Sequence, residues 1–203
     1  LERTPRIHAH ELVPNLAEIE HSIDVPITDD PWLIHHLEPV LDARVLMHLW
    51  REPHGGVAHL NLDLTPETVE SAAYRRFRAA TEMREAETIT FEMAYRTVVE
   101  RPEAARRAFD TVHHDRFHLA LDRVPPDAAR SALDAAGLCT AVKVDVRDGR
   151  LLEPAVQRRL GEAVEAAGPL AVVAEGVRSQ AEVDAARQCG VPYIQGPAAR
   201  DLI

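Results

Sequence analysis

The chain is poor in cysteine and in long apolar runs. Only two of the 203 residues are cysteine, Cys139 and Cys189, and they form no CxxC pair, so we expect reduced, buried thiols rather than a disulfide framework or a zinc site. No apolar run reaches the roughly 18 residues that span a membrane, and the first residues show no signal-peptide pattern. We therefore expect a cytoplasmic protein whose present segment makes no membrane contact.

Positively charged residues are also few relative to negatively charged ones. The chain has 23 lysine and arginine residues against 33 aspartate and glutamate residues, which gives a net charge of −10. A protein that binds the phosphate backbone of a nucleic acid needs a basic face. We expect no nucleic-acid partner.

Lysine is almost absent. Of the 23 basic residues only Lys143 is a lysine, and it lies in the apolar segment 141–146. A compact ammonium can be buried and can change its pKa in a way that a guanidinium cannot. This placement favours a site position over a surface position for Lys143.

What the chain does contain is an alternation of short apolar segments with helical patterns. Seven strands are predicted, at residues 7–13, 57–64, 88–95, 117–124, 140–146, 170–174 and 191–194. Helices are predicted between them, at residues 31–50, 66–80, 104–113, 127–136, 153–167 and 179–188, whereas residues 14–30 are expected to be irregular. The alternation predicts an α/β fold with a parallel sheet, most economically a TIM-like (β/α) barrel. We expect residues 1–203 to form a single domain, and a fragment of a longer protein because the chain begins without a methionine.

Each predicted strand carries a polar residue, or is followed directly by one, that a purely apolar core would not select. In chain order these residues are Glu11, Asn61, Glu92, Asp122, Lys143, Glu175 and Gln195. In a barrel the carboxyl ends of the strands meet on one face, where active sites lie. Carboxylate and amide oxygens together suit Mg²⁺, Mn²⁺ or Ca²⁺. Taken singly, each residue is explained as well by a capping or surface position.

The order of these residues resembles the EAL domain family, the cyclic di-GMP phosphodiesterases and their inactive relatives. The family's "EAL" resembles Glu11-Leu12-Val13, "NLS" resembles Asn61-Leu62-Asp63, and "E(I/L)TE" resembles Glu92-Met93-Ala94-Tyr95. Further along, "DDFG" resembles Asp122-Arg123-Val124-Pro125, "KID" resembles Lys143-Val144-Asp145, and "AEGVE…QG" resembles residues 174–178 with Gln195-Gly196. The family barrel usually has one more strand before the first motif. This barrel is therefore expected either to lack its first strand or to have a modified one.

The resemblance implies a role for each matched residue. The metal, Mg²⁺ or Mn²⁺ if any is retained, would be bound by Glu11, Asn61, Glu92 and Asp122. Lys143 and Glu175 would hold or activate the attacking water in metal-assisted phosphodiester hydrolysis. If the domain still senses cyclic di-GMP, we expect Arg123, Gln195 and Asn15 to contact this ligand.

Several positions depart from the family pattern. Arg123 replaces the second aspartate of "DD" and places a cation where a second metal needs an anion. Tyr95 and Arg178 replace two further glutamates, and Asn15 stands where the family has an arginine that grips the nucleotide. We therefore predict a degenerate EAL-like domain, catalytically inactive, with Lys143 and Glu175 vestigial. It would act as a cyclic di-GMP-responsive receptor or as a protein-docking module in bacterial signalling.

Two enzyme alternatives remain open. One is an active or weakly active, metal-dependent cyclic di-GMP phosphodiesterase. The other is an amidohydrolase-like metal barrel, because His8-Ala9-His10 resembles the HxH metal pair of that class, although the later strands lack the further histidines that it needs. A protein partner or a homodimer is a further expectation, since an open barrel edge can pair with another chain.

Overall fold

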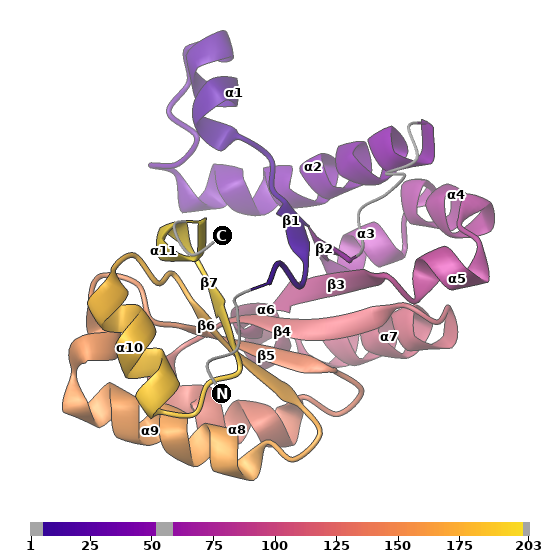
Figure 1. Ribbon diagram of the computed structural model, residues 1–203. Helices are drawn as coiled ribbons and strands as arrows, with labels where there is room; N and C mark the ends of the chain where they lie inside the picture. Colours follow the sequence, from indigo (N-terminus) through magenta and orange to yellow (C-terminus); the bar gives the residue numbers. More distant parts are fainter. Residues whose placement is uncertain (1–5, 52–58, 201–203) are drawn as a thin grey trace. The chain divides into compact units, whose positions relative to one another are not determined.

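The computed structural model describes residues 6–51 and 59–200 (Figure 1). These residues form two compact units that interleave along the sequence. The described part of the first unit comprises residues 6–8, 92–102 and 119–200. The described part of the second comprises residues 9–51, 59–91 and 103–118. Within these residues no helix is long and apolar enough to cross a membrane.

Seven strands form one sheet in the order in which they occur in the sequence. They are β1 (His10–Leu12), β2 (Leu60–Asp63), β3 (Ile89–Ala94), β4 (His118–Val124), β5 (Ala141–Asp145), β6 (Ala171–Glu175) and β7 (Tyr193–Gln195). The pairs β1–β2, β4–β5, β5–β6 and β6–β7 are parallel. Sequential order, parallel pairing and a helical connection after each strand are typical of a TIM-like barrel, so the predicted fold class is confirmed.

All seven predicted strands are present. β6 has the predicted length but is shifted by one residue, and the other six are shorter than predicted. The first two residues of the predicted strand 57–64 lie outside the described residues. Within residues 6–51 and 59–200 no strand precedes β1, so the sheet begins at the strand that carries Glu11. This start agrees with the expectation of a missing or modified first strand.

Helical segments connect the strands. They are α1 (Leu16–Ile23) and α2 (Pro31–Arg51), then α3 (Pro66–Val69), α4 (Ala72–Ala80) and α5 (Met83–Ala86), then α6 (Tyr95–Glu100) and α7 (Pro102–His114), then the 3-10 turn η1 (Pro126–Ala128) with α8 (Ala129–Ala135), the turn η2 (Arg150–Leu152) with α9 (Pro154–Ala166), α10 (Gln180–Gln188) and α11 (Pro197–Arg200).

Two helix predictions were wrong in detail. Residues 14–30 are not irregular throughout, because Asn15 caps α1 by accepting the Glu18 N–H at 3.2 Å. The predicted helix 66–80 is divided into α3 and α4, because Ser71 begins a new helix by accepting the Tyr74 N–H at 3.2 Å. Both differences come from short polar side chains that satisfy the free N–H groups of a helix start.

The first unit packs its sheet against a layer of helices. In Figure 1, α8, α9 and α10 lie side by side along strands β5 to β7. Three consecutive residues of β4, Leu119, Ala120 and Leu121, are almost fully buried. A strand that is buried on both faces takes a continuous apolar sequence, so a polar residue in such a strand is there for a specific contact.

The second unit has an aromatic core. Tyr74 and Phe77 of α4 pack on Phe91 of β3 and on Phe117, with ring centroids 5.0 Å apart for Phe91–Phe117 and 5.9 Å apart for Tyr74–Phe91. All four side chains are buried. This cluster uses four of the nine aromatic residues of the chain, which explains how so few aromatics suffice for a core.

Asp42 is a buried carboxyl group in the second unit. Its Oδ2 accepts hydrogen bonds from the Thr65 N–H at 2.9 Å and from Thr68 Oγ1 at 3.0 Å, which joins α2 to the start of α3. Burial raises the pKa of Asp42 from 3.8 to about 7, against the opposing effect of these hydrogen bonds. Between pH 3.8 and about 7, the Asp42 carboxyl group therefore keeps its proton in the folded protein and has lost it in the unfolded chain.

We predict that Asp42→Asn stabilises the protein more at pH 8 than at pH 5. The stability of the wild type falls as the pH rises through this window, because a buried carboxyl must ionise, whereas the amide keeps an acceptor for Thr65 and cannot ionise. Thermal unfolding at both pH values should show a relative gain on the order of 1–3 kcal/mol for the variant at pH 8. Asp110→Asn, on the exposed side of α7, should show no such gain, and equal effects at both pH values would contradict the prediction.

Candidate functional site

Three polar residues lie level with one another at the carboxyl ends of β5, β6 and β7, all in the first unit. Asp145 is the register partner of Glu175, and Glu175 is the register partner of Gln195. Register partners on neighbouring parallel strands share a face of the sheet. Glu175 and Gln195, which were predicted as site residues, are therefore brought together, and Asp145 joins them.

Two glycines fix the backbone immediately after these strand ends. Gly196 has φ +138°, and a Cβ there would lie 2.3 Å from the Val177 carbonyl oxygen and 2.6 Å from its nitrogen. Gly176 has φ +90°, and a Cβ there would lie 2.2 Å from Cγ of Arg147. Only a residue without Cβ fits at either position, which keeps the loops after β6 and β7 in close contact.

Lys143 is buried among carboxylates of the first unit. It is 2% exposed, and its Nζ lies 2.5 Å from Glu92 Oε2 and 3.4 Å from Asp122 Oδ1. Glu92 on β3 is 1% exposed and Asp122 on β4 is 3% exposed. The sequence predicted that Lys143 occupies a site position, and the structure brings it together with two of the four predicted metal ligands.

Glu175 is a half-buried carboxyl group with an unsatisfied oxygen. Its Oε2 is buried and accepts no hydrogen bond. Burial and the Asp122 charge raise the pKa of Glu175 to about 7, while the charges of Lys143 and Arg147 oppose this rise. A group that is partly protonated at neutral pH, with an open oxygen, can either accept or donate a proton.

Arg123 follows Asp122 in an unusual backbone conformation. Its φ is +52°, and the pairing of β4 with β5 shifts register between Leu121 and Val124. Arg123 Nε donates to Asp122 Oδ2 at 2.9 Å. Asp122 is therefore held between two cations, the Lys143 ammonium and the Arg123 guanidinium.

Arg147 was not predicted as a site residue. Its Nε and Nη2 donate to Asp145 Oδ1 and Oδ2 at 2.8 and 2.6 Å, and these bonds lower the pKa of Asp145. Its stem lies against Gly176, at the end of the strand that carries Glu175. The sequence offered no signal for this placement, since it depends on the turn after β5. Arg178 is one of the positions that depart from the family pattern, and its Nη1 lies 3.7 Å from Asp148 Oδ1.

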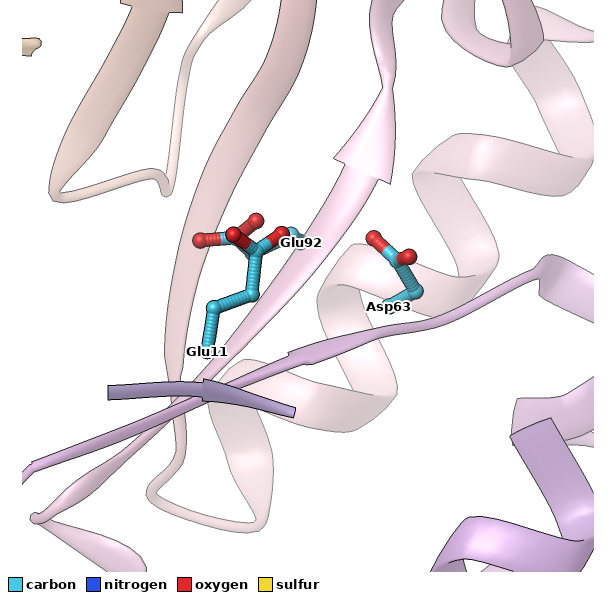
Figure 2. Close-up of side chains that lie close together, drawn as sticks. All are labelled: Glu11, Asp63 and Glu92. Carbon is cyan, nitrogen blue, oxygen red and sulfur yellow. The ribbon is translucent and has the colours of Figure 1, made fainter. Parts of the chain in front are cut away.

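The second unit contributes its own acidic pair. Glu11 on β1 is the register partner of Asn61 on β2, and Asp63 lies two residues further along β2, hence on the same face. Figure 2 shows the Glu11 and Asp63 side chains. A carboxylate oxygen of Glu11 lies within 4.8 Å of a carboxylate oxygen of Asp63. Asp63 was not predicted, although its two-residue spacing from Asn61 was a readable signal. Oxygen donors of this kind suit a hard divalent cation.

The remaining predicted positions have local roles. The Asn15 side chain is exposed, and besides capping α1 its Nδ2 donates to Glu18 Oε2 at 3.2 Å. The His8 ring packs against Tyr193 with centroids 4.7 Å apart, and both His8 and His10 are exposed. In the described part of the chain no histidine belongs to a group of three metal-ligand side chains.

We predict that Gly196→Ala destabilises the protein far more than Gly168→Ala. Both glycines have positive φ, but a Cβ at Gly168 would meet nothing within 4 Å, whereas at Gly196 it would meet the Val177 backbone. Chemical unfolding should show a loss of roughly 2–4 kcal/mol for Gly196→Ala and about 1 kcal/mol for Gly168→Ala. Similar losses for both variants would show that the close approach to Val177 is unimportant.

We also predict that Lys143→Met destabilises the protein by about 3 kcal/mol or more, because it removes the ammonium beside the buried Glu92 carboxylate and leaves Asp122 with one cation, Arg123, in place of two. Adding Glu92→Gln to this variant should restore part of the loss, since the carboxylate that lay 2.5 Å from Lys143 Nζ is then uncharged. Arg96→Met breaks an exposed pair with Glu100 and serves as the control. Urea unfolding measures all three, and wild-type stability of Lys143→Met would contradict the prediction.

Several solved structures share this fold. The EAL domain of Xanthomonas citri FimX, solved with cyclic di-GMP, matches with a TM-score of 0.65 and 16% identity over 88% of this chain and 71% of that chain. Klebsiella pneumoniae BlrP1, solved with manganese and cyclic di-GMP, has a TM-score of 0.63 and 18% identity over 88% of this chain and 46% of its own. The EAL domain of Mycobacterium smegmatis DcpA has a TM-score of 0.62 and 18% identity over 81% of this chain and 78% of its own. At such identities the likeness establishes the fold.

A comparison with curated protein sequences finds no match. The family model of the EAL domain matches residues 25–200, a range that includes every predicted site residue except Glu11 and Asn15. The order of strands and the site on β3 to β7 agree with this match. The chain belongs to the EAL domain family.

Proposed function

We propose that this chain is a degenerate EAL domain that binds cyclic di-GMP without hydrolysing it and acts as a receptor in bacterial signalling. The observation that carries the proposal is the pair of cations on Asp122: Lys143 Nζ lies 3.4 Å from Oδ1, and Arg123 Nε lies 2.9 Å from Oδ2. Both carboxylate oxygens of a proposed metal ligand already have a positively charged neighbour. This charge distribution favours an anionic ligand over a set of divalent ions.

Two-metal hydrolysis is disfavoured by the side chain at position 123. Such a mechanism needs two cations about 4 Å apart, each held by carboxylates. Here a guanidinium stands directly after Asp122 and bonds to it, and a guanidinium cannot be deprotonated to relieve the repulsion of a second metal.

Within each unit, the oxygen donors that are present suit a Mg²⁺ or Mn²⁺ ion. In the first unit the proposed ligands are Glu92 and Asp122, and Asp122 Oδ1 is a buried oxygen that accepts no hydrogen bond. In the second unit the proposed ligands are Glu11 and Asn61. A bound ion would polarise a phosphoryl oxygen of the ligand. Lys143 and Glu175 would then position water or ligand without driving turnover.

The ligand class is supported by the family and by what its members bind. FimX and BlrP1 were both solved with cyclic di-GMP, the latter with manganese in one complex and calcium in another. In the first unit of this chain, Arg123 and Gln195 are the proposed ligand contacts. Asn15, which the sequence also predicted as a ligand contact, belongs to the second unit and caps α1. If cyclic di-GMP does not bind, we propose instead that the chain is a protein-docking module. It would then bind a protein partner or a second copy of the chain.

A weakly active phosphodiesterase is the second candidate, and one observation favours it. Glu175 has a pKa of about 7 and a buried oxygen without a hydrogen-bond partner. These are properties of a general base that works near neutral pH. The activity would then depend on a single metal ion and would fall when Glu175 is changed.

We predict that cyclic di-GMP binds with a Kd of roughly micromolar or below and is not turned over. Calorimetric titration with EDTA, with Mg²⁺ and with Mn²⁺ measures binding, and chromatography of the same mixtures detects a linear dinucleotide product. Glu175→Gln should change the affinity, while Glu165→Gln on the exposed side of α9 should not. Sustained hydrolysis of cyclic di-GMP with Mn²⁺ would instead establish the phosphodiesterase. If no heat of binding is measured at high ligand concentration, the protein-docking module is the function that stays in question.

A further inference from the structure

Exposed apolar side chains gather in one segment of the second unit. In the described part of the chain twelve large apolar side chains are exposed, and six of them lie in residues 13–50: Val13, Ile23, Val25, Trp32, Val40 and Trp50. These six include both tryptophans of the chain, and Trp32 is 67% exposed. Scattered exposed apolar residues are ordinary, but a concentration of them that includes tryptophan is typical of a binding surface.

A ridge of exposed residues runs along α2. The residues that follow one another at intervals of four are all exposed; they are Trp32, His36, Val40, Arg44 and His48, and we call them the α2 ridge. At its start the Trp32 and His36 rings pack together with centroids 4.0 Å apart. Residues four apart form the ridges that pack into the grooves of a neighbouring helix. The α2 ridge therefore has the form of a helix-packing face.

The exposed charge of α2 is positive. Arg44 belongs to the α2 ridge, and Arg51 follows three residues after its last member. Both arginine side chains are exposed, and no described residue forms an ion pair with either of them. The ridge itself contains no carboxylate. An acidic and partly apolar partner would match this face.

The segment that precedes α2 has these properties. Residues 16–30 contain five carboxylates and no lysine or arginine; the carboxylates are Glu18, Glu20, Asp24, Asp29 and Asp30. Leu16, Ile19 and Ile23 form an apolar stripe along α1, yet no residue of α1 is buried and Ile23 is 54% exposed. The connection to α2 is fixed, because Thr28 Oγ1 donates to Glu20 Oε1 at 2.7 Å. An acidic, amphipathic helix is thus held in place with its apolar stripe uncovered.

We propose that α1 of one copy of this chain packs on the α2 ridge of a second copy, which returns the same contact, so that two chains form a symmetric dimer. A two-fold interface uses each surface twice, so one unit must carry both complementary faces, as the second unit does here. Charge determines which helix meets which, because two basic ridges or two acidic α1 helices would repel each other. The Trp32 and Val40 side chains would leave water in the dimer. The proposal goes beyond the proposed function and does not depend on a nucleotide.

Sedimentation velocity of the nucleotide-free chain, from about 1 to about 500 µM, measures the association. We expect a monomer–dimer equilibrium that is weakened about tenfold or more by Arg44→Glu with Arg51→Glu, and likewise by Val40→Asp. Arg76→Glu with Arg130→Glu makes the same change in net charge at exposed positions of α4 and α8, and should alter the affinity less than about twofold. Thermal melting establishes that each variant is folded.

A mixing experiment tests whether α1 is the partner of the α2 ridge. Glu18→Arg with Asp29→Arg changes exposed acidic positions of residues 16–30 and should weaken association when tested alone. Mixed with the Arg44→Glu, Arg51→Glu variant, it should associate about tenfold more tightly than either variant does by itself. In the mixed dimer one contact is that of the wild type, and in the other the introduced arginines lie opposite the introduced glutamates.

Tryptophan fluorescence gives an independent measurement, because both tryptophans of the chain lie in α2. Emission should shift to shorter wavelength as the dimer forms, with the same concentration dependence as the sedimentation. A chain that stays monomeric over the whole range overturns the proposal and leaves this face to a different protein. Association without an emission shift, or association that Arg44→Glu with Arg51→Glu leaves unchanged, places the dimer on another face and overturns it. Mixed variants that fail to associate show that α1 does not meet the α2 ridge, which also overturns it.

Discussion

The buried ammonium of Lys143 is the constraint on which the first unit depends. An ammonium that is 2% exposed is tolerated only if opposite charges lie beside it, and here Glu92 and Asp122 supply them. The three residues come from β3, β4 and β5, so the contact needs all three strand ends in register. A slip of one residue in any of these strands would turn its charged side chain to the other face and leave the others uncompensated. The ion pairs therefore specify the sheet as well as the site.

The charges around Lys143 determine what the site can bind. Three cations, Lys143, Arg123 and Arg147, lie among four carboxyl groups, those of Glu92, Asp122, Asp145 and Glu175. With Glu175 near its pKa at neutral pH, the positive and negative charges come close to balance. A divalent ion added to this set would have to compete with cations that the chain itself supplies. The Arg123 and Arg147 guanidinium groups are already oriented, because each is held by its own aspartate.

The sequence was sufficient for the strands and for bringing several polar residues of the first unit to neighbouring strands, and the reason is local. A polar residue inside a short apolar run is conspicuous, and parallel strands bring such residues to a common end, so Lys143, Glu175 and Gln195 could be singled out from the pattern alone, while their roles stay predictions. Arg147 could not, because its position follows from a turn and from the missing side chain of Gly176, which only the folded backbone reveals. The start of α1 at Asn15 and the break between α3 and α4 at Ser71 were missed for a related reason. Each of these two helix starts depends on one capping hydrogen bond, which the spacing of the apolar residues does not reveal.

Several features that mark the chain as an EAL domain have structural causes that do not require catalysis. Gly196 is needed because the backbones of the loops after β6 and β7 approach too closely for a Cβ, and Gly176 because Arg147 of the loop after β5 lies against it. Lys143 is needed because two buried carboxylates lie beside it. These residues would be kept in an active and in an inactive domain alike, so their presence does not distinguish the two. Position 123 is where we expect an active and an inactive domain to differ, since a carboxylate there would invite a second metal and a guanidinium would repel it. The substituted positions, and not the retained ones, carry the argument for binding over hydrolysis.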